Sequence, residues 1–159
     1  MSEIYIKTLI IALLAIQFGS FLLLILLKQI FRNLPEKIVV QIANNMILTS
    51  ILVTLSLAFF LIKIPQHHYI FDIGTWFKTF EGNYEIIFIL DSLSVIYSLF
   101  SMIMIGVIIV FSRRYLHKEA GYFRFYLFMN LFTLGLVLIS FAGNMEITII
   151  GLEFVGIAS

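Results

Sequence analysis

Three carboxylates lie in or beside apolar segments, where a carboxylate can do proton chemistry. Glu153 lies within the apolar run that follows Thr148, and Glu146 comes seven residues earlier. In lipid, removal from water favours the neutral form of a carboxyl group, whereas a nearby cation favours the charged form. A carboxyl group between these two influences can take up and release a proton. Glu153 is therefore the first candidate for a catalytic, proton-handling residue.

The expected depth of Glu153 in the membrane supports a proton-handling role. Along a helix it would lie ~10 Å deeper than Glu146. A carboxylate within a membrane costs about 2.5–3.5 kcal/mol on insertion scales, so it usually has a partner and a function. The alternative is that Glu153 lies near the interface, or stays protonated and hydrogen-bonds to a neighbouring helix. Gly151 and Gly156 flank Glu153, and such small residues permit close approach of another helix.

Glu146 and Asp91 are candidates for a proton relay. Glu146 would share a helical face with Glu153, because seven residues make about two turns. A role as an interfacial anchor is favoured for it. Asp91 opens an apolar run in the sequence LDSLS. A carboxylate at this place can cap the helix and interacts favourably with its dipole, so the capping role is favoured for Asp91.

The composition indicates a membrane protein. Of 159 residues, 62% are apolar and 12% are charged, against about 45–50% and about 25% in soluble domains. A hydrocarbon core of about 30 Å requires about 20 apolar helical residues. Four uncharged runs satisfy this requirement, and we expect transmembrane helices over residues 8–27, 38–62, 92–111 and 125–145.

A fifth apolar run, residues 147–159, is shorter. The 14 residues from Glu146 to Ser159 would form ~21 Å of helix, less than the ~30 Å core. A helix that ends in hydrocarbon leaves carbonyl groups unpaired. We therefore expect another polypeptide to cover this end, or the chain to be a part of a longer one. A split gene, a truncated reading frame and a partial sequence all fit. The expected fold is an all-α membrane domain over residues 1–159, with four transmembrane helices and a truncated fifth.

Basic residues predict the orientation of these helices. They gather after the first expected helix (Lys28, Arg32 and Lys37) and after the third (Arg113, Arg114, Lys118 and Arg124). The positive-inside rule assigns both segments to the cytoplasm or the mitochondrial matrix, which places the N-terminus outside.

The long connection between the second and third expected helices would lie on the outer surface. Tyr69–Phe71 and Tyr84–Phe88 show alternating patterns, and the polar residues Glu81–Asn83 separate them. This arrangement is typical of two short strands joined by a turn. We therefore expect a short surface hairpin, with Trp76 suited to the membrane interface.

The sequence also argues against several functions. It contains no cysteine, so thiolate-held metals, iron–sulfur clusters and disulfides are excluded. A net charge of +1 does not suggest nucleic-acid binding. His67 and His68 are adjacent but have no third ligand at a useful spacing. We expect no cofactor or metal in this chain.

Three stretches near the end carry a resemblance to a known family. They are FILDSLSVIYSL at residues 88–99, YLHKEAGYFRFYLFMNLF at 115–132 and GNMEITIIGLEFVGIAS at 143–159. These residues resemble the N-terminal part of chain 5 (subunit L) of proton-pumping NADH:quinone oxidoreductase, respiratory complex I. The last stretch is the most specific. In the family it usually reads Gly-Trp-Glu followed by Val-Gly and a small residue, and its Glu aligns with Glu153; Leu152 stands where the family typically has Trp.

The resemblance implies a function and partners. Glu153 would be the outer-half member of a Glu/Lys pair whose charge state changes with redox energy released elsewhere, so that protons move through the membrane arm. The chain would be a subunit of a translocase with no redox centre of its own. Its partners would be the lipid bilayer, the other membrane subunits of complex I and a polypeptide that supplies the remaining helices and the deep lysine. The membrane would be the bacterial cell inner membrane or the mitochondrial inner membrane.

Two alternatives remain open. Multisubunit cation/proton antiporters share the motif, so the chain could be a subunit of such an antiporter. It could also be a non-catalytic membrane scaffold or a remnant.

Overall fold

Five helices and one hairpin make up the computed structural model, which describes residues 2–31, 34–63, 68–79 and 82–159. In chain order they are α1 (Ser2–Ile30), α2 (Glu36–Lys63), β1 (His68–Thr79), β2 (Gly82–Asp91), α3 (Ser92–Tyr115), α4 (Tyr122–Phe141) and α5 (Met145–Ala158). Among the described residues, α1 to α4 are the four helices long and apolar enough to cross a membrane. The expected fold class is confirmed, and the chain is a multi-pass membrane protein.

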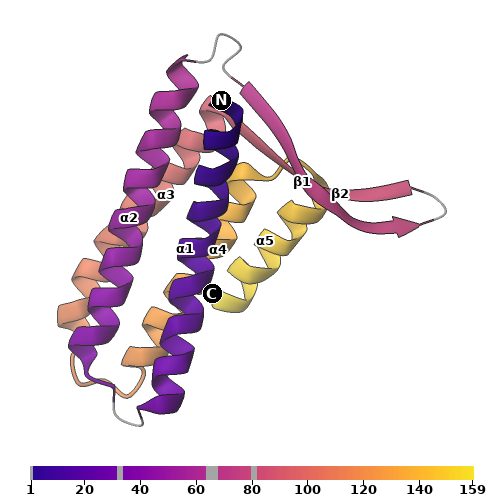
Figure 1. Cartoon of the computed structure of the whole chain (residues 1–159). Coiled ribbons are helices and arrows are strands. Elements are labelled where there is room, and N and C mark those ends of the chain that lie inside the picture. Colours follow the sequence, from indigo (N-terminus) through magenta and orange to yellow (C-terminus); the bar gives the residue numbers. More distant parts are fainter. Residues whose placement is uncertain (1, 32–33, 64–67, 80–81) are drawn as a thin grey trace.

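Helices α1 to α4 form an up-and-down bundle in which neighbours along the chain pack together and α1 also packs against α4. The turns between α1 and α2 and between α3 and α4 therefore lie at one end. The antiparallel hairpin β1–β2 lies at the other end, beside the start of α1 (Figure 1). Helix α5 descends from the hairpin end along α4, outside the four-helix bundle (Figure 1).

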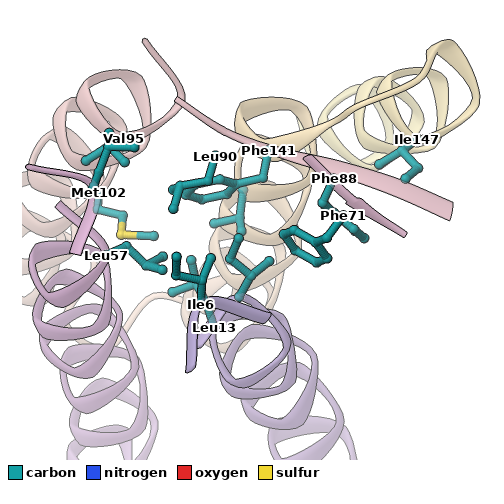
Figure 2. Packing of buried hydrophobic residues seen from close by; sticks show 13 residues of the cluster. Ile6, Leu13, Leu57, Phe71, Phe88, Leu90, Val95, Met102, Phe141 and Ile147 are labelled. Carbon is teal, nitrogen blue, oxygen red and sulfur yellow. The ribbon is translucent and has the colours of Figure 1, made fainter. Parts of the chain in front are cut away.

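The hairpin is joined to the bundle by a buried apolar cluster (Figure 2). Phe71 and Phe88 stack with their ring centroids 5.9 Å apart. Both rings are buried in the cluster together with Phe141 at the end of α4 and Ile6 near the start of α1. The hairpin is thus part of the folded core at this end and holds the ends of α1 and α4 together.

Polar side chains connect the helices inside the bundle. The Gln17 amide donates to the Ser50 hydroxyl at 2.8 Å and joins α1 to α2. The Ser20 hydroxyl donates to Asn130 Oδ1 at 2.6 Å and joins α1 to α4. Lipid is as apolar as the side chains that face it, so burial of apolar surface drives helix association weakly in a membrane. Close packing and such interhelical hydrogen bonds fix the arrangement instead.

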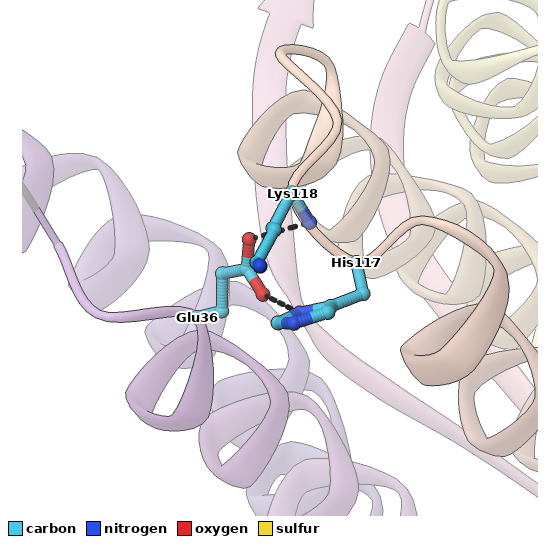
Figure 3. Close-up of polar contacts among 3 residues, drawn as sticks. All are labelled: Glu36, His117 and Lys118. Carbon is cyan, nitrogen blue, oxygen red and sulfur yellow. Dashed lines mark hydrogen bonds and ion pairs between the residues drawn. The ribbon is translucent and has the colours of Figure 1, made fainter.

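The opposite end of the bundle is tied by one carboxylate (Figure 3). Glu36, at the start of α2, lies 2.7 Å from His117 Nδ1 in the α3–α4 turn. The backbone N–H of Lys118 donates to the other Glu36 oxygen at 3.0 Å, and Lys118 adopts a positive φ of 67°. The start of α2 and the α3–α4 turn are therefore held together by contacts outside the apolar core.

The fourth helix ends earlier than the sequence predicts. We expected it over residues 125–145, but α4 ends at Phe141 and α5 begins at Met145. The reason is a turn held by the hairpin, because the Gly143 N–H donates to the Ile87 carbonyl at 2.8 Å. A Cβ on Gly143 would stand 2.7 Å from that carbonyl oxygen, so only glycine fits this approach. Helices α1 and α2 run past both expected ends and α3 past its expected last residue, because charged residues at these ends are also helical, whereas α5 begins two residues early and ends at Ala158.

Candidate proton-handling site

Asn144 determines where the helix that carries Glu153 begins. Its side-chain oxygen accepts from the Ile147 N–H at 3.4 Å and caps α5. Its amide nitrogen donates to the Glu85 carbonyl of β2 at 2.5 Å. One side chain therefore both starts α5 and ties it to the hairpin, which fixes the height at which Glu153 lies.

A close backbone contact with α4 fixes the rotation of α5. A Cβ on Gly151 would stand 2.9 Å from the Gly135 carbonyl oxygen and 2.7 Å from the Ile139 side chain. Helices approach this closely only where small residues face each other. Gly151 and Ile147 are buried on this face. Glu153 is two residues from Gly151, about 200° around the helix, and so it points away from α4.

The opposite face of α5 is open and mostly apolar. Its exposed residues are Met145, Glu146, Ile149, Leu152, Glu153, Gly156 and Ile157. The structure thus brings Glu146 and Glu153 to one face, as their spacing predicts. Leu152, which stands where the family that the sequence resembles typically has Trp, is 55% exposed beside Glu153. Gly156 lies on the same face, and a Cβ there would meet nothing within 4 Å.

Within the part of the chain that the structure describes, Glu153 has no hydrogen-bond or salt-bridge partner. The lysines and arginines of this part lie in the hairpin, in the α3–α4 turn or within two turns of a helix end. None lies midway along a transmembrane helix. A cation that pairs with Glu153 at its depth must therefore belong to residues other than those described.

Asp91 is a helix cap in the structure. Its Oδ1 accepts from the N–H and from the hydroxyl of Ser94, both at 2.7 Å. Burial raises the pKa of the Asp91 carboxyl, but the hydrogen bonds from Ser94 and Leu93 outweigh burial and leave this pKa below its ordinary value. A carboxylate with a lowered pKa stays charged at neutral pH, which favours the capping role over the relay role.

Asp91 also borders a cavity that is separate from the open face of α5. The cavity has a volume of about 360 Å³ and lies between the end of β2, α3 and α4. Its walls include Tyr97 and Ile139 but no residue of α5. The structure therefore does not bring Asp91 to the face that carries Glu146 and Glu153.

Sequence reasoning missed a row of hydroxyl groups between α3 and α4. Ser98 and Ser101 are buried on α3 and face Thr133 and Ser140 of α4. Ser94 is also buried on α3 and lines the cavity beside Asp91 together with Ser140. The Ser98 hydroxyl is buried without a partner among the described residues. The signal was available in the sequence, because the spacing of three and four residues places these serines on one helical face.

The expectation that the adjacent histidines His67 and His68 bind no metal stays a prediction. His67 lies outside the described residues. Among the residues that the structure describes, no group of three or more His, Asp or Glu side chains could hold a metal ion.

A comparison with known proteins found a relative of the same kind that the sequence resembles. No family model matches the chain. The chain is 33% identical over 137 residues to NADH-quinone oxidoreductase subunit L of Buchnera aphidicola subsp. Schizaphis graminum (strain Sg). The match covers 82% of this chain and 22% of that protein, so the chain spans about a fifth of the length of this relative.

Proposed function

We propose that this chain is part of the proton-translocating membrane arm of an NADH:quinone oxidoreductase, in which Glu153 handles the proton. The observation that carries this proposal is the position of Glu153 on the open face of α5, about two turns beyond Glu146. The similarity to the Buchnera subunit L supports the assignment to complex I.

The open face of α5 calls for a polypeptide partner. The other face is already fixed on α4 through Gly151. A carboxylate on the open face would be costly in lipid, whereas a helix with a cationic side chain would neutralise it. Gly156 leaves room for such a helix to approach. We infer that a lysine on this partner forms the pair with Glu153.

The Glu/Lys pair gives the chemistry. With the lysine close by, the Glu153 carboxylate stays charged, because the cation stabilises the charged form. When the lysine moves away or loses its charge, the same carboxylate is left in an apolar setting and takes up a proton. Restoring the cation releases that proton. This chain supplies the carboxylate and the helix that positions it. The driving energy comes from redox subunits elsewhere in the complex.

The orientation is part of the proposal. With the N-terminus outside, Glu146 lies near the outer surface and Glu153 lies in the outer half of the membrane. Glu146 then anchors α5 at the interface or passes protons to and from Glu153.

Native electrophoresis tests the assignment to the complex. Membranes that contain the full chain are solubilised gently and separated, and the band that holds the chain is identified by mass spectrometry and stained for NADH oxidation. We expect the chain in an NADH-oxidising band with other complex I membrane subunits. A band of antiporter subunits without NADH oxidation, or the chain alone, would contradict the proposal.

A pair of glycine variants locates the partner in the same experiment. A Cβ on Gly156 or on Gly19 meets nothing within 4 Å in this structure. Gly156→Leu is expected to weaken assembly, because the larger side chain blocks the approaching helix. Gly19→Leu, on the exposed side of α1, is the matched control and should assemble normally. Equal assembly of both variants would argue against a partner on α5.

A further inference from the structure

An apolar groove runs between α2 and α3, away from the site on α5. It has a volume of about 480 Å³. On one side it is lined by Asn44, Leu48 and Ile51 of α2, and on the other by Ile103, Val107, Val110 and Phe111 of α3. Its floor depends on Gly106, where a Cβ would stand 3.2 Å from the Ile47 side chain. The two helices therefore approach each other closely at Gly106.

A second cavity continues the groove at the end of α3. It has a volume of about 880 Å³ and shares Val110 and Phe111 with the groove. Arg113, Arg114 and Tyr115 complete its walls. Both arginines are exposed, and neither has a salt bridge within the described part of the chain. The nearby Glu36 carboxylate is already occupied by His117 and Lys118.

The combined shape matches one leaflet of a bilayer. From Ile103 to Phe111 the groove follows eight residues, or ~12 Å of helix, close to half of the ~30 Å hydrocarbon core. The arginines follow directly, at the height where headgroups begin. Guanidinium groups pair with phosphate oxygens through two parallel hydrogen bonds. Tyrosines such as Tyr115 are common at this level of the membrane.

We propose that this groove binds a phospholipid with an anionic headgroup. One acyl chain lies along the groove between α2 and α3, and the lipid phosphate binds Arg113 and Arg114. A transmembrane helix seated in the groove would have to bring acidic side chains to neutralise the two arginines, whereas an anionic lipid carries its own phosphate. The site contains no residue of α5 and does not rest on the proposed function.

Photocrosslinking in nanodiscs tests this site. The full chain is purified with the subunits that accompany it and placed in nanodiscs that contain phosphatidylglycerol or phosphatidylcholine, each with the same photoreactive acyl chain. Crosslinked peptides are mapped by mass spectrometry. We expect more crosslinking of α2 and α3 groove residues by phosphatidylglycerol than by phosphatidylcholine. A basic residue near an anionic lipid contributes a factor of about 5 in affinity, so the preference should fall by up to about 25-fold in Arg113→Gln/Arg114→Gln.

Two matched controls keep the result interpretable. Arg124→Gln removes an exposed charge at the start of α4 that does not border either cavity, and it should keep the preference. Leu48→Trp fills the groove and should abolish crosslinking there. Leu52→Trp, one turn away at a 65% exposed position outside the groove, should not. Equal crosslinking by both lipids, or groove residues that crosslink to no lipid because a polypeptide covers them, would overturn the proposal.

Discussion

Gly135 and Gly151 bring the backbones of α4 and α5 into contact: the Gly151 carbonyl oxygen lies 2.7 Å from the place that a Cβ on Gly135 would take. This contact determines more than packing. Since it fixes the rotation of α5 on α4, it also determines that Glu153 and Glu146 lie on the opposite, open face. The direction of the candidate carboxylate is therefore set by two glycines that take no part in proton chemistry.

Gly151→Ala is expected to displace α5. The added methyl group would overlap the Gly135 carbonyl and the Ile139 side chain, and overpacking of this kind costs about 1–3 kcal/mol. Thermal unfolding of the solubilised full chain, followed by size-exclusion chromatography, measures the loss of stability. Gly19→Ala is the control, because its Cβ would meet nothing within 4 Å. If both variants unfold at the same temperature, the close contact is not present.

Removing one partner of the buried hydrogen bond between Gln17 and Ser50 should cost more stability than removing both partners. Ser50→Ala leaves the buried Gln17 amide without its acceptor, and we expect a loss of about 0.6–2 kcal/mol. The double variant Gln17→Leu/Ser50→Ala removes both partners and should recover much of this loss. Thermal unfolding of the unaltered chain, Ser50→Ala and the double variant provides the comparison. A double variant no more stable than Ser50→Ala would contradict this account.

Asp91→Asn separates the two roles considered for Asp91. Asparagine caps helices about as well as aspartate, so the capping role predicts unchanged stability near neutral pH and unchanged proton translocation. Asp91→Ala should lower stability by about 0.5–2 kcal/mol. A loss of translocation in Asp91→Asn at normal stability would restore the relay role.

The lowered pKa of Asp91 also predicts a pH dependence. A carboxylate whose pKa is lower in the folded state stabilises the fold above its unfolded pKa. This contribution is lost as the pH falls through the folded value, below about pH 4. Asp91→Asn should flatten the acid limb of the stability curve measured by thermal unfolding. An equal loss of stability at low pH in both proteins would show that the capping hydrogen bonds do not favour the charged form of Asp91.

The sequence predicts the elements of the fold better than the ends of α4 and α5. Uncharged runs indicate α1 to α4 because the bilayer sets their length, and alternation around Glu81–Asn83 indicates the hairpin. Counting apolar residues alone does not reveal the turn at Gly143, because Ala142 and Gly143 are uncharged. Asn144 just before Met145 was a capping signal that would have moved the boundary.

The candidate site was predictable only in part. The seven-residue spacing places Glu146 and Glu153 on one face, and the structure has them there. Which face of α5 meets α4 depends on Gly135, in a different helix, and no local pattern contains that pairing. The groove that ends at Arg113 also combines two helices far apart in sequence. Such sites depend on tertiary packing, which sequence periodicity does not specify.

The central claim is that Glu153 handles the translocated proton. It is tested by proton uptake into sealed inverted membrane vesicles driven by NADH, measured in Glu153→Gln and in the control Glu119→Gln, which changes an exposed carboxylate in the α3–α4 turn. NADH oxidation with a water-soluble electron acceptor is measured in the same vesicles to establish that the redox subunits are intact. Losing a positioned proton-transfer group typically slows its step about 100-fold or more. We therefore predict that Glu153→Gln reduces NADH-driven proton uptake to background, while oxidation by the soluble acceptor continues and Glu119→Gln retains its uptake. Unchanged proton uptake in Glu153→Gln would contradict the claim.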